Sequence, residues 1–177
     1  VTVSLWDRLS DVLFTDEQKA QMERKAPPSA SNITIDQKGL VYTITDISTD
    51  PDMVLRKLNL TGNSMLHVDF PIVNPSAVHV GAIGNIYIGT HDGYLMELDT
   101  DGNLLFLFGS PDDGSQRMGL FNTISAVDLD GCGRLFVLDD SKNIIQIFQK
   151  TAFTEKVHNA LSLYQEGKYM QSRQPWN

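Results

Sequence analysis

Four aspartates lie close together in the sequence and are the first candidates for chemistry. They are Asp128, Asp130, Asp139 and Asp140. Carboxylate oxygens are ligands that Ca²⁺ and Mg²⁺ prefer, and a bound ion of this kind can act as a Lewis acid. Asp128, Asp130 and Asp139 are therefore the candidate metal ligands. A structural interpretation competes with this one, because Asp130 and Asp140 occupy expected turns, where an aspartate accepts hydrogen bonds from its own backbone.

Other residue types that support catalysis are sparse. The four histidines are His67, His79, His91 and His158, and no pair has the i, i+4 spacing of a helical zinc site. His79 and His91 fall in one repeat and could converge, although a solvated or hydrogen-bonded histidine is the ordinary outcome. The single cysteine, Cys132, excludes an intrachain disulfide and lies in a turn with no neighbouring base.

A repeated glycine–aromatic pattern marks the elements that must position these residues. In three places, two apolar residues two positions apart lead to a glycine, and an aromatic residue follows three positions after it. The glycine permits the positive φ of a tight hairpin, and the aromatic begins the partner strand and packs on the neighbouring sheet. A second hairpin gives about four strands per copy, which is typical of a propeller blade. The glycine–aromatic pairs are Gly39 and Tyr42, Gly84 and Tyr87, and Gly133 and Phe136.

Helical patterns flank the repeats and divide the chain into three parts. Residues 1–27 are expected to form an N-terminal helical segment that ends at the prolines. Residues 28–150 carry the three blades. Residues 151–177 return to helix, with Thr154 as the expected N-cap and Gly167 as the stop. The expected fold is mainly β: a partial propeller of about three four-stranded blades between N- and C-terminal helices.

The third copy resembles an NHL repeat. Residues 136–148 read FVLDDSKNIIQIF, and residues 96–109 resemble the outer hairpin of the same repeat. The resemblance covers residues 28–150. One departure is that Thr45 and Thr90 stand in the other copies at the position of Asp139.

The whole layout is similar to that of bacterial NHL-repeat proteins of the six-bladed type, which carry a helical insertion and are often exported or membrane-anchored. This resemblance implies an extracytoplasmic or membrane-anchored bacterial protein. The tail resembles one tetratricopeptide unit, with Gly167, Tyr169 and Trp176 at motif positions. A single unit of that kind cannot bury its own apolar face.

Three blades do not close a ring, since propellers carry four to eight. Three hypotheses follow. The chain is a fragment of a longer protein whose other blades precede it, two chains close a six-bladed ring as a homodimer, or the blades stack with the N-terminal helices as caps. We favour the fragment.

Composition limits the function classes. The net charge of −8 and the scattered lysines and arginines argue against nucleic-acid binding. The longest apolar run, residues 104–108, is too short to span a membrane. The primary hypothesis is a non-enzymatic binding or scaffold module that needs no cofactor and recognises a protein, peptide or glycan through its propeller loops. The alternative is a metal-dependent, lactonase-like hydrolase that holds Ca²⁺ or a similar ion with Asp128, Asp130 and Asp139, as propellers of the gluconolactonase type do.

Overall fold

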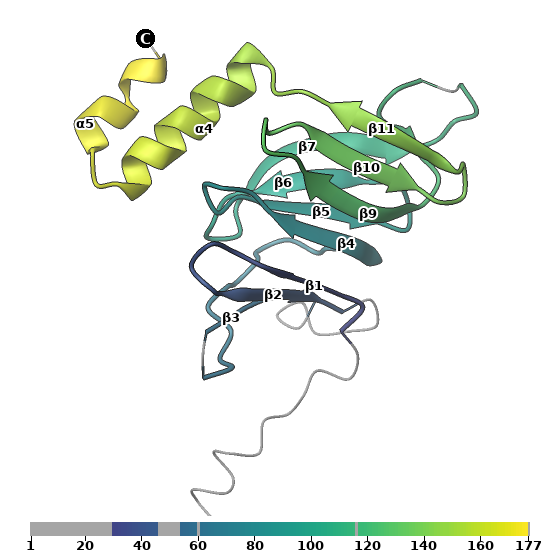
Figure 1. Ribbon diagram of the computed structural model, residues 1–177, viewed down its shortest axis with the longest axis horizontal. Helices are drawn as coiled ribbons and strands as arrows, with labels where there is room; N and C mark the ends of the chain where they lie inside the picture. Colours follow the sequence, from purple (N-terminus) through teal and green to yellow (C-terminus); the bar gives the residue numbers. More distant parts are fainter. Residues whose placement is uncertain (1–29, 46–53, 60, 116, 177) are drawn as a thin grey trace, which may run out of the picture.

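Three small sheets lie one upon another, and a pair of helices projects to one side of the stack, beyond the ends of the strands (Figure 1). The computed structural model describes residues 30–45, 54–59, 61–115 and 117–176. The helical segment expected over residues 1–27 therefore lies outside the described residues. The expected mainly-β fold with blade-like sheets and C-terminal helices is confirmed.

The first blade is an antiparallel sheet in the order β1-β2-β3. Its turn between β1 and β2 contains Gly39, whose φ of +79° is the left-handed conformation that the repeat pattern predicts. The sheet ends in one isolated bridge between Leu58 and Ser64 in place of a full fourth strand. Its strands are β1 (Asn32–Ile35), β2 (Val41–Ile44) and β3 (Leu55–Leu58).

The middle blade contains the expected four antiparallel strands and one addition. A two-residue strand, β8, pairs in parallel with the outermost strand β7. Every residue of β5 and β6 is buried, because the blade is covered on both faces. The strands are β4 (Pro75–Val80), β5 (Ile86–Thr90), β6 (Leu95–Leu98), β7 (Leu104–Pro111) and β8 (Leu120–Phe121).

In the described part of the chain, the third blade has three strands in the order β11-β10-β9, with β11 at the edge. Among the residues that the structure describes, the middle blade has the expected four antiparallel strands, whereas the first and third blades have three. The chain turns into a helix after β11 instead of returning as a fourth strand. The strands are β9 (Ile124–Leu129), β10 (Leu135–Asp139) and β11 (Ile144–Phe148).

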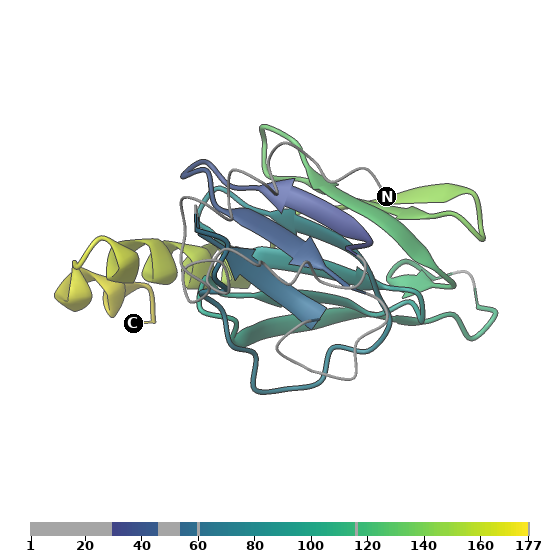
Figure 2. The ribbon, with the colours of Figure 1, turned by 90° about the horizontal axis from the view of Figure 1, so that it is seen from below.

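Two apolar clusters hold the blades together, one at each junction. Alternate residues of a strand face opposite sides of its sheet. Each blade therefore has a backward face, toward the preceding blade in the sequence, and a forward face, toward the next blade. Tyr42 faces forward into the first cluster and Tyr87 into the second, and both are buried. The prediction that the repeat aromatic packs on the neighbouring sheet is confirmed for these two. Figure 2 shows the sheets from below.

The C-terminal helices begin with α4 (Ala152–Gln165), followed by α5 (Tyr169–Ser172) and the 3-10 turn η1 (Gln174–Trp176). The N-cap of α4 is Thr151, whose hydroxyl accepts a hydrogen bond from the backbone N–H of Thr154. The prediction of Thr154 as the cap is therefore wrong by one turn. Gly167, with φ +75°, ends the helix as predicted. Among the described residues, no helix is long and apolar enough to cross a membrane.

Candidate functional site

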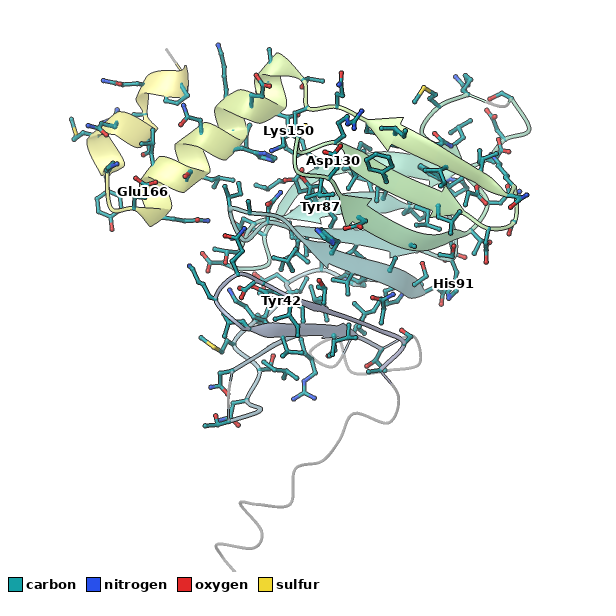
Figure 3. All side chains as sticks on the ribbon, viewed as in Figure 1. Tyr42, Tyr87, His91, Asp130, Lys150 and Glu166 are labelled. Atoms are coloured by element: carbon teal, nitrogen blue, oxygen red, sulfur yellow. The ribbon has the colours of Figure 1, made fainter. Side chains whose placement is uncertain are left out.

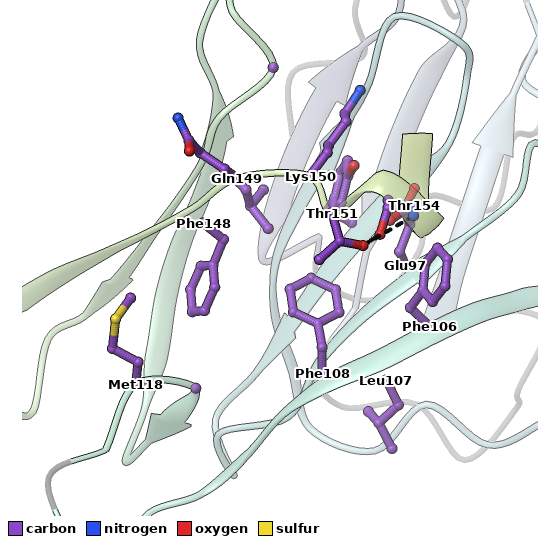
Figure 4. A pocket seen from close by; sticks show the side chains of 14 residues that line it. Glu97, Phe106, Leu107, Phe108, Met118, Phe148, Gln149, Lys150, Thr151 and Thr154 are labelled. Carbon is purple, nitrogen blue, oxygen red and sulfur yellow. Dashed lines mark hydrogen bonds between the residues drawn. The ribbon is translucent and has the colours of Figure 1, made fainter. Parts of the chain in front are cut away.

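A cleft of about 340 Å³ opens between the outer parts of the middle and third blades, at the start of α4. Strand β7 contributes Phe106 and Phe108 to its wall, and the end of β11 contributes Phe148. Figure 4 shows these rings around the opening, with Met118 at one side and Thr151 and Thr154 at the other. The cleft is mostly apolar with a few polar groups, which is the usual composition of a ligand site.

The apolar wall is partly exposed. The exposed fractions are 37% for Phe108 and 70% for Met118. Phe108 and Phe148 meet edge to face, with ring centroids 6.0 Å apart across the blade junction. The geometry is favourable for aromatic rings, and it keeps both walls in place while one face of each ring lines the opening.

A buried polar network lies at the inner end of the cleft. Glu97 on β6 and Tyr87 on β5 both line the cleft and face forward. The Glu97 Oε1 lies 2.6 Å from His158 Nε2 and accepts a hydrogen bond of 2.5 Å from Asn85 Nδ2. The Asn85 amide also donates to the Tyr87 hydroxyl oxygen at 2.9 Å. All four side chains are less than a tenth exposed.

This network explains how a carboxylate is tolerated in the core. A buried carboxylate needs hydrogen-bond donors, and Glu97 receives them from the middle blade and from His158 of α4. Burial raises the pKa of the Tyr87 phenol well above its ordinary value, and the nearby Glu97 carboxylate raises it further. The His158 Nδ1 atom is buried and has no hydrogen-bond partner among the described residues.

A second hollow, of about 540 Å³, joins the cleft at the same end of the blades. It lies between the β4–β5 and β9–β10 hairpin loops, and Tyr87, Gly133 and Lys150 line both spaces. In Figure 3, Lys150, Asp130 and the start of α4 lie together at this end. The cleft is therefore continuous with a surface made by hairpin loops.

Asp139, a predicted metal ligand, is fully buried and already satisfied by backbone donors. Its carboxylate accepts hydrogen bonds from the backbone N–H groups of Asn122 at 2.7 Å, Thr123 at 3.4 Å and Lys142 at 3.1 Å. These contacts tie the β8–β9 connection to the β10–β11 loop. The side chain acts as a structural acceptor in this geometry.

The other two predicted ligands lie elsewhere on the blade. Asp130 accepts hydrogen bonds in its own turn from the backbone N–H groups of Cys132 and Arg134, and these bonds, with the Arg134 guanidinium, lower the pKa of its carboxyl. Asp128 pairs with His79 Nδ1 at 3.1 Å across the blade junction. Within the described part of the chain, no group of three or more His, Cys, Asp or Glu side chains gathers as a metal site would require.

His79 and His91, which fall in one repeat, do not converge, and His79 pairs with Asp128 instead. His79 lies near the end of β4 and pairs in register with Tyr87. The backbone N–H of His91 donates to Asn74 O at the start of β4, so the two histidines mark opposite ends of the hairpin. Figure 3 places His91 at the end of the stack away from Lys150. Cys132 is an exposed turn residue, as predicted.

The residues that sequence reasoning missed are Glu97 and His158. A polar residue in the alternating pattern of β6, where Leu95 and Leu98 are apolar, is a weak signal of a buried acceptor. Its partner is 61 residues away in a helix, so no local spacing connects the two. His158 stands on the apolar stripe of α4 between Val157 and Ala160, which is the second weak signal.

The fold and the repeat define the class of protein. The structure is similar to the WD40 β-propeller domain of Doa1, with a TM-score of 0.53, 16% identity, and coverage of 67% of this chain and 36% of that one. The three sheets are thus blades of the β-propeller type.

The sequence comparison is more specific. No family model matches the chain. Over 145 residues, 73% of the chain, it is 30% identical to human NHL repeat-containing protein 3, and over 124 residues it is 31% identical to the mouse protein of that name. The chain is therefore similar in sequence to NHL repeat-containing proteins. It spans 40% of the length of the human relative and 34% of the mouse relative.

Proposed function

We propose that the chain is a non-enzymatic binding module of a propeller protein and that the aromatic cleft between the middle and third blades receives an apolar side chain of a protein or peptide. The observation that carries this proposal is the exposure of Phe108 and Met118 around a preformed opening. Apolar side chains that gather around a cleft at the molecular surface are a feature of interaction sites.

The polar surroundings support a peptide as the ligand. Lys150 and the exposed Gln149 stand at the mouth of the cleft, where they can meet the polar backbone of a bound chain. The hairpin loops around the adjoining hollow extend the surface, which agrees with recognition through propeller loops. A glycan or another protein surface would bind to the same loops. The cleft favours a protein or peptide, because it selects for an apolar side chain.

A displayed library of six-residue peptides tests this proposal. We expect enrichment of sequences with one aromatic or large aliphatic residue. Phe108→Ala weakens binding of the enriched peptides about tenfold, because the variant removes one wall of the cleft. Tyr164→Ala is the matched control, since this ring is 61% exposed on α4 and does not line the cleft. Equal binding by the Phe108→Ala variant would contradict the proposal.

We further propose that the chain has no catalytic metal and no cofactor. Asp139 and Asp130 are occupied by backbone hydrogen bonds, and Asp128 is occupied by His79, so the three carboxylates of the hydrolase alternative serve other contacts. Metal analysis of the purified protein and its melting temperature with and without added calcium test this. A stoichiometric ion, or a rise in melting temperature with calcium, would favour the lactonase-like alternative.

Further blades, we propose, cover the two outer faces of the stack. Ile33 and Ile35 are 63% and 62% exposed on the backward face of the first blade, whereas Val78 and Val80, at the same repeat positions in the middle blade, are 4% and 8% exposed. A second copy of the chain could supply the missing blades and close a ring. The mass in solution decides: a strict monomer rules out the dimeric ring.

The tail and the origin remain predictions. The helices α4 and α5 have the helix–turn–helix form of a tetratricopeptide unit, with Tyr164 and Tyr169 in edge-to-face contact at 5.1 Å. We propose that further helices pack there. Bacterial origin and an extracytoplasmic or anchored location rest on the similarity of layout, and the sequence of the whole gene product tests both.

A further inference from the structure

The outer edge of the third blade lacks the strand that the middle blade has. In the middle blade, β7 pairs with β6 as the fourth strand. The equivalent third strand of the next blade, β11, pairs with β10 on one side and has no strand on its other side among the described residues. An edge strand of this kind presents unpaired N–H and C=O groups to an incoming chain.

The aromatic cleft lies beside this open edge. Phe148 at the end of β11, with Gln149 and Lys150 after it, forms one side of the cleft, and Phe108 and Met118 form the other. Phe148 faces backward toward the middle blade, since it pairs in register with the core residue Leu135. A strand that extends the sheet beyond β11 would alternate in the same way, so every second side chain would face the cleft.

The exposed side chains of β11 fit a sheet that continues outward. Ile145 and Ile147 lie on the forward face and are 61% and 45% exposed. A neighbouring strand would cover part of these side chains through cross-strand contacts, as β7 does for β6. The open edge and the adjoining cleft thus indicate an extended strand that carries an apolar side chain, while a further blade would cover the forward face of Ile145 and Ile147.

The charges indicate a partner protein as the source of this strand. Two basic residues beside the site, Lys142 and Arg117, are already paired with Asp112 and Asp113. Lys150 has no ion pair among the described residues, and it lies at the end of β11 where the cleft opens. An acidic residue next to an apolar one complements this end of the edge, whereas this chain, with net charge −8, repels a second copy.

We propose that the open edge of β11 binds an extended peptide segment of a partner protein as a fourth strand, with an aromatic or large aliphatic side chain in the cleft and a carboxylate at Lys150. This proposal deepens the proposed function and rests on it. Pairing to a sheet edge supplies affinity through backbone hydrogen bonds, and the pocket supplies specificity for alternate side chains. The added strand runs antiparallel to β11, as β7 does to β6. Its N-terminal end therefore lies near Lys150.

A designed peptide tests the proposal directly. The probe is acetyl-Asp-Thr-Phe-Thr-Val-Thr-amide, which places Phe and Val on one face and Asp at its N-terminal end. Isothermal titration with the whole chain measures its affinity, and hydrogen exchange measures the amides of residues 144–148. We expect slowed exchange at those β11 amides that do not face β10. N-methylation of alternate peptide amides should weaken binding about tenfold, while methylation of the intervening amides has little effect.

Two variants separate the inference from the proposed function. Phe108→Ala should weaken both the parent and the methylated peptides, and Lys150→Gln should weaken only peptides that contain the Asp. If Phe108→Ala weakens binding but every N-methylated peptide binds as the parent does, the cleft binds side chains and strand addition is wrong. If the probe does not bind at all, both strand addition and binding of an apolar side chain in the cleft are contradicted. A free chain that is dimeric, with β11 amides already protected, would overturn the proposal in favour of a second copy.

Discussion

The middle and third blades derive from the same repeat and differ in what surrounds them. Each has the positive-φ glycine and the aromatic three residues later, and the paired strands keep the same register. The middle blade has four antiparallel strands, and its aromatic Tyr87 is 3% exposed. The third blade has three strands, and its aromatic Phe136 is only half-buried. The repeat therefore encodes the hairpins, and the neighbouring blade determines how far each face is buried.

The difference in surroundings is clearest at one position of the third strand in each blade. The residue paired with the repeat aromatic on the third strand is Lys57 in the first blade, Glu97 in the middle blade and Ile147 in the third. The Lys57 ammonium donates to Thr100 in the next blade, and burial lowers the pKa of that group. Glu97 is bound by α4, and Ile147 has no covering blade. The residue type at this position thus varies with the element that covers the forward face of each blade.

The largest expected effect comes from the glycines of the hairpins. Gly93 in the middle blade has φ +83°, and a Cβ added there would lie only 2.3 Å from the carbonyl oxygen of Phe121. Gly93→Ala combines left-handed strain with a backbone collision and should lower the free energy of unfolding by about 4 kcal/mol. Gly133→Ala is the control, because it has similar φ and meets only the Lys150 side chain, so about 1 kcal/mol is expected. Denaturant unfolding measures both, and equal losses would refute the tight approach of Gly93 to the Phe121 carbonyl.

The next largest effect is expected from removing Glu97, the acceptor of the buried network that the middle blade has and the third blade lacks. Glu97→Ala leaves His158 and Asn85 without their acceptor and should cost about 3 kcal/mol of unfolding free energy. A double variant, His158→Leu with Glu97→Leu, replaces both members of the pair by apolar side chains of similar volume. We expect the double variant to be more stable than Glu97→Ala. The unfolding free energies of the two variants, measured at one pH, make this comparison, and a double variant no more stable than Glu97→Ala would contradict the role of unpaired buried groups.

Asp139 is the feature that the third blade has and the middle blade lacks. Thr90 stands at the same position in the middle blade, and its hydroxyl accepts one backbone hydrogen bond from Tyr94. Asp139→Asn weakens a buried acceptor of three backbone donors and should lower the unfolding free energy by about 2 kcal/mol, with no response to calcium in either protein. Asp140→Asn, at an exposed turn position, should change stability little. Thermal melts with and without calcium measure both effects, and a calcium response lost in Asp139→Asn would instead identify a metal ligand.

The contrast between the blades also separates what the sequence predicts from what it does not. Strands β10 and β11 lie within the NHL-like repeat, and the hairpin glycines have positive φ as expected, because alternation and turn chemistry are local properties. The three-stranded sheet of the third blade was not predicted, although the helix expected from residue 151 leaves too few residues after β11 for a fourth strand. The Glu97–His158 contact and the cleft were missed because they join a strand, an edge and a helix that only tertiary packing brings together. The structural interpretation correctly placed Asp130 and Asp140 in turns, whereas Asp128 and Asp139 lie in strands β9 and β10.

The smallest expected effect concerns pH at the junction of the two blades. Burial lowers the pKa of the His79 imidazole, and Asp128 of the third blade partly opposes this shift. The unfolded chain, with a histidine pKa of about 6.5, therefore takes up a proton more readily than the folded one. The stabilising contribution is complete above about pH 6.5 and is lost as the pH falls through the folded-state pKa, by less than about 1 kcal/mol because the pair is partly exposed.

Two variants test this junction. Asp128→Asn removes the group that raises the pKa of His79, so protonation of His79 costs more and the stability loss between pH 7 and pH 5 becomes steeper. His79→Gln removes the titrating group and should flatten that part of the profile. Urea unfolding at pH 7, 6 and 5 measures all three proteins. A shallower profile for Asp128→Asn would mean that the third blade does not act on His79, and that the junction is held by its apolar cluster alone.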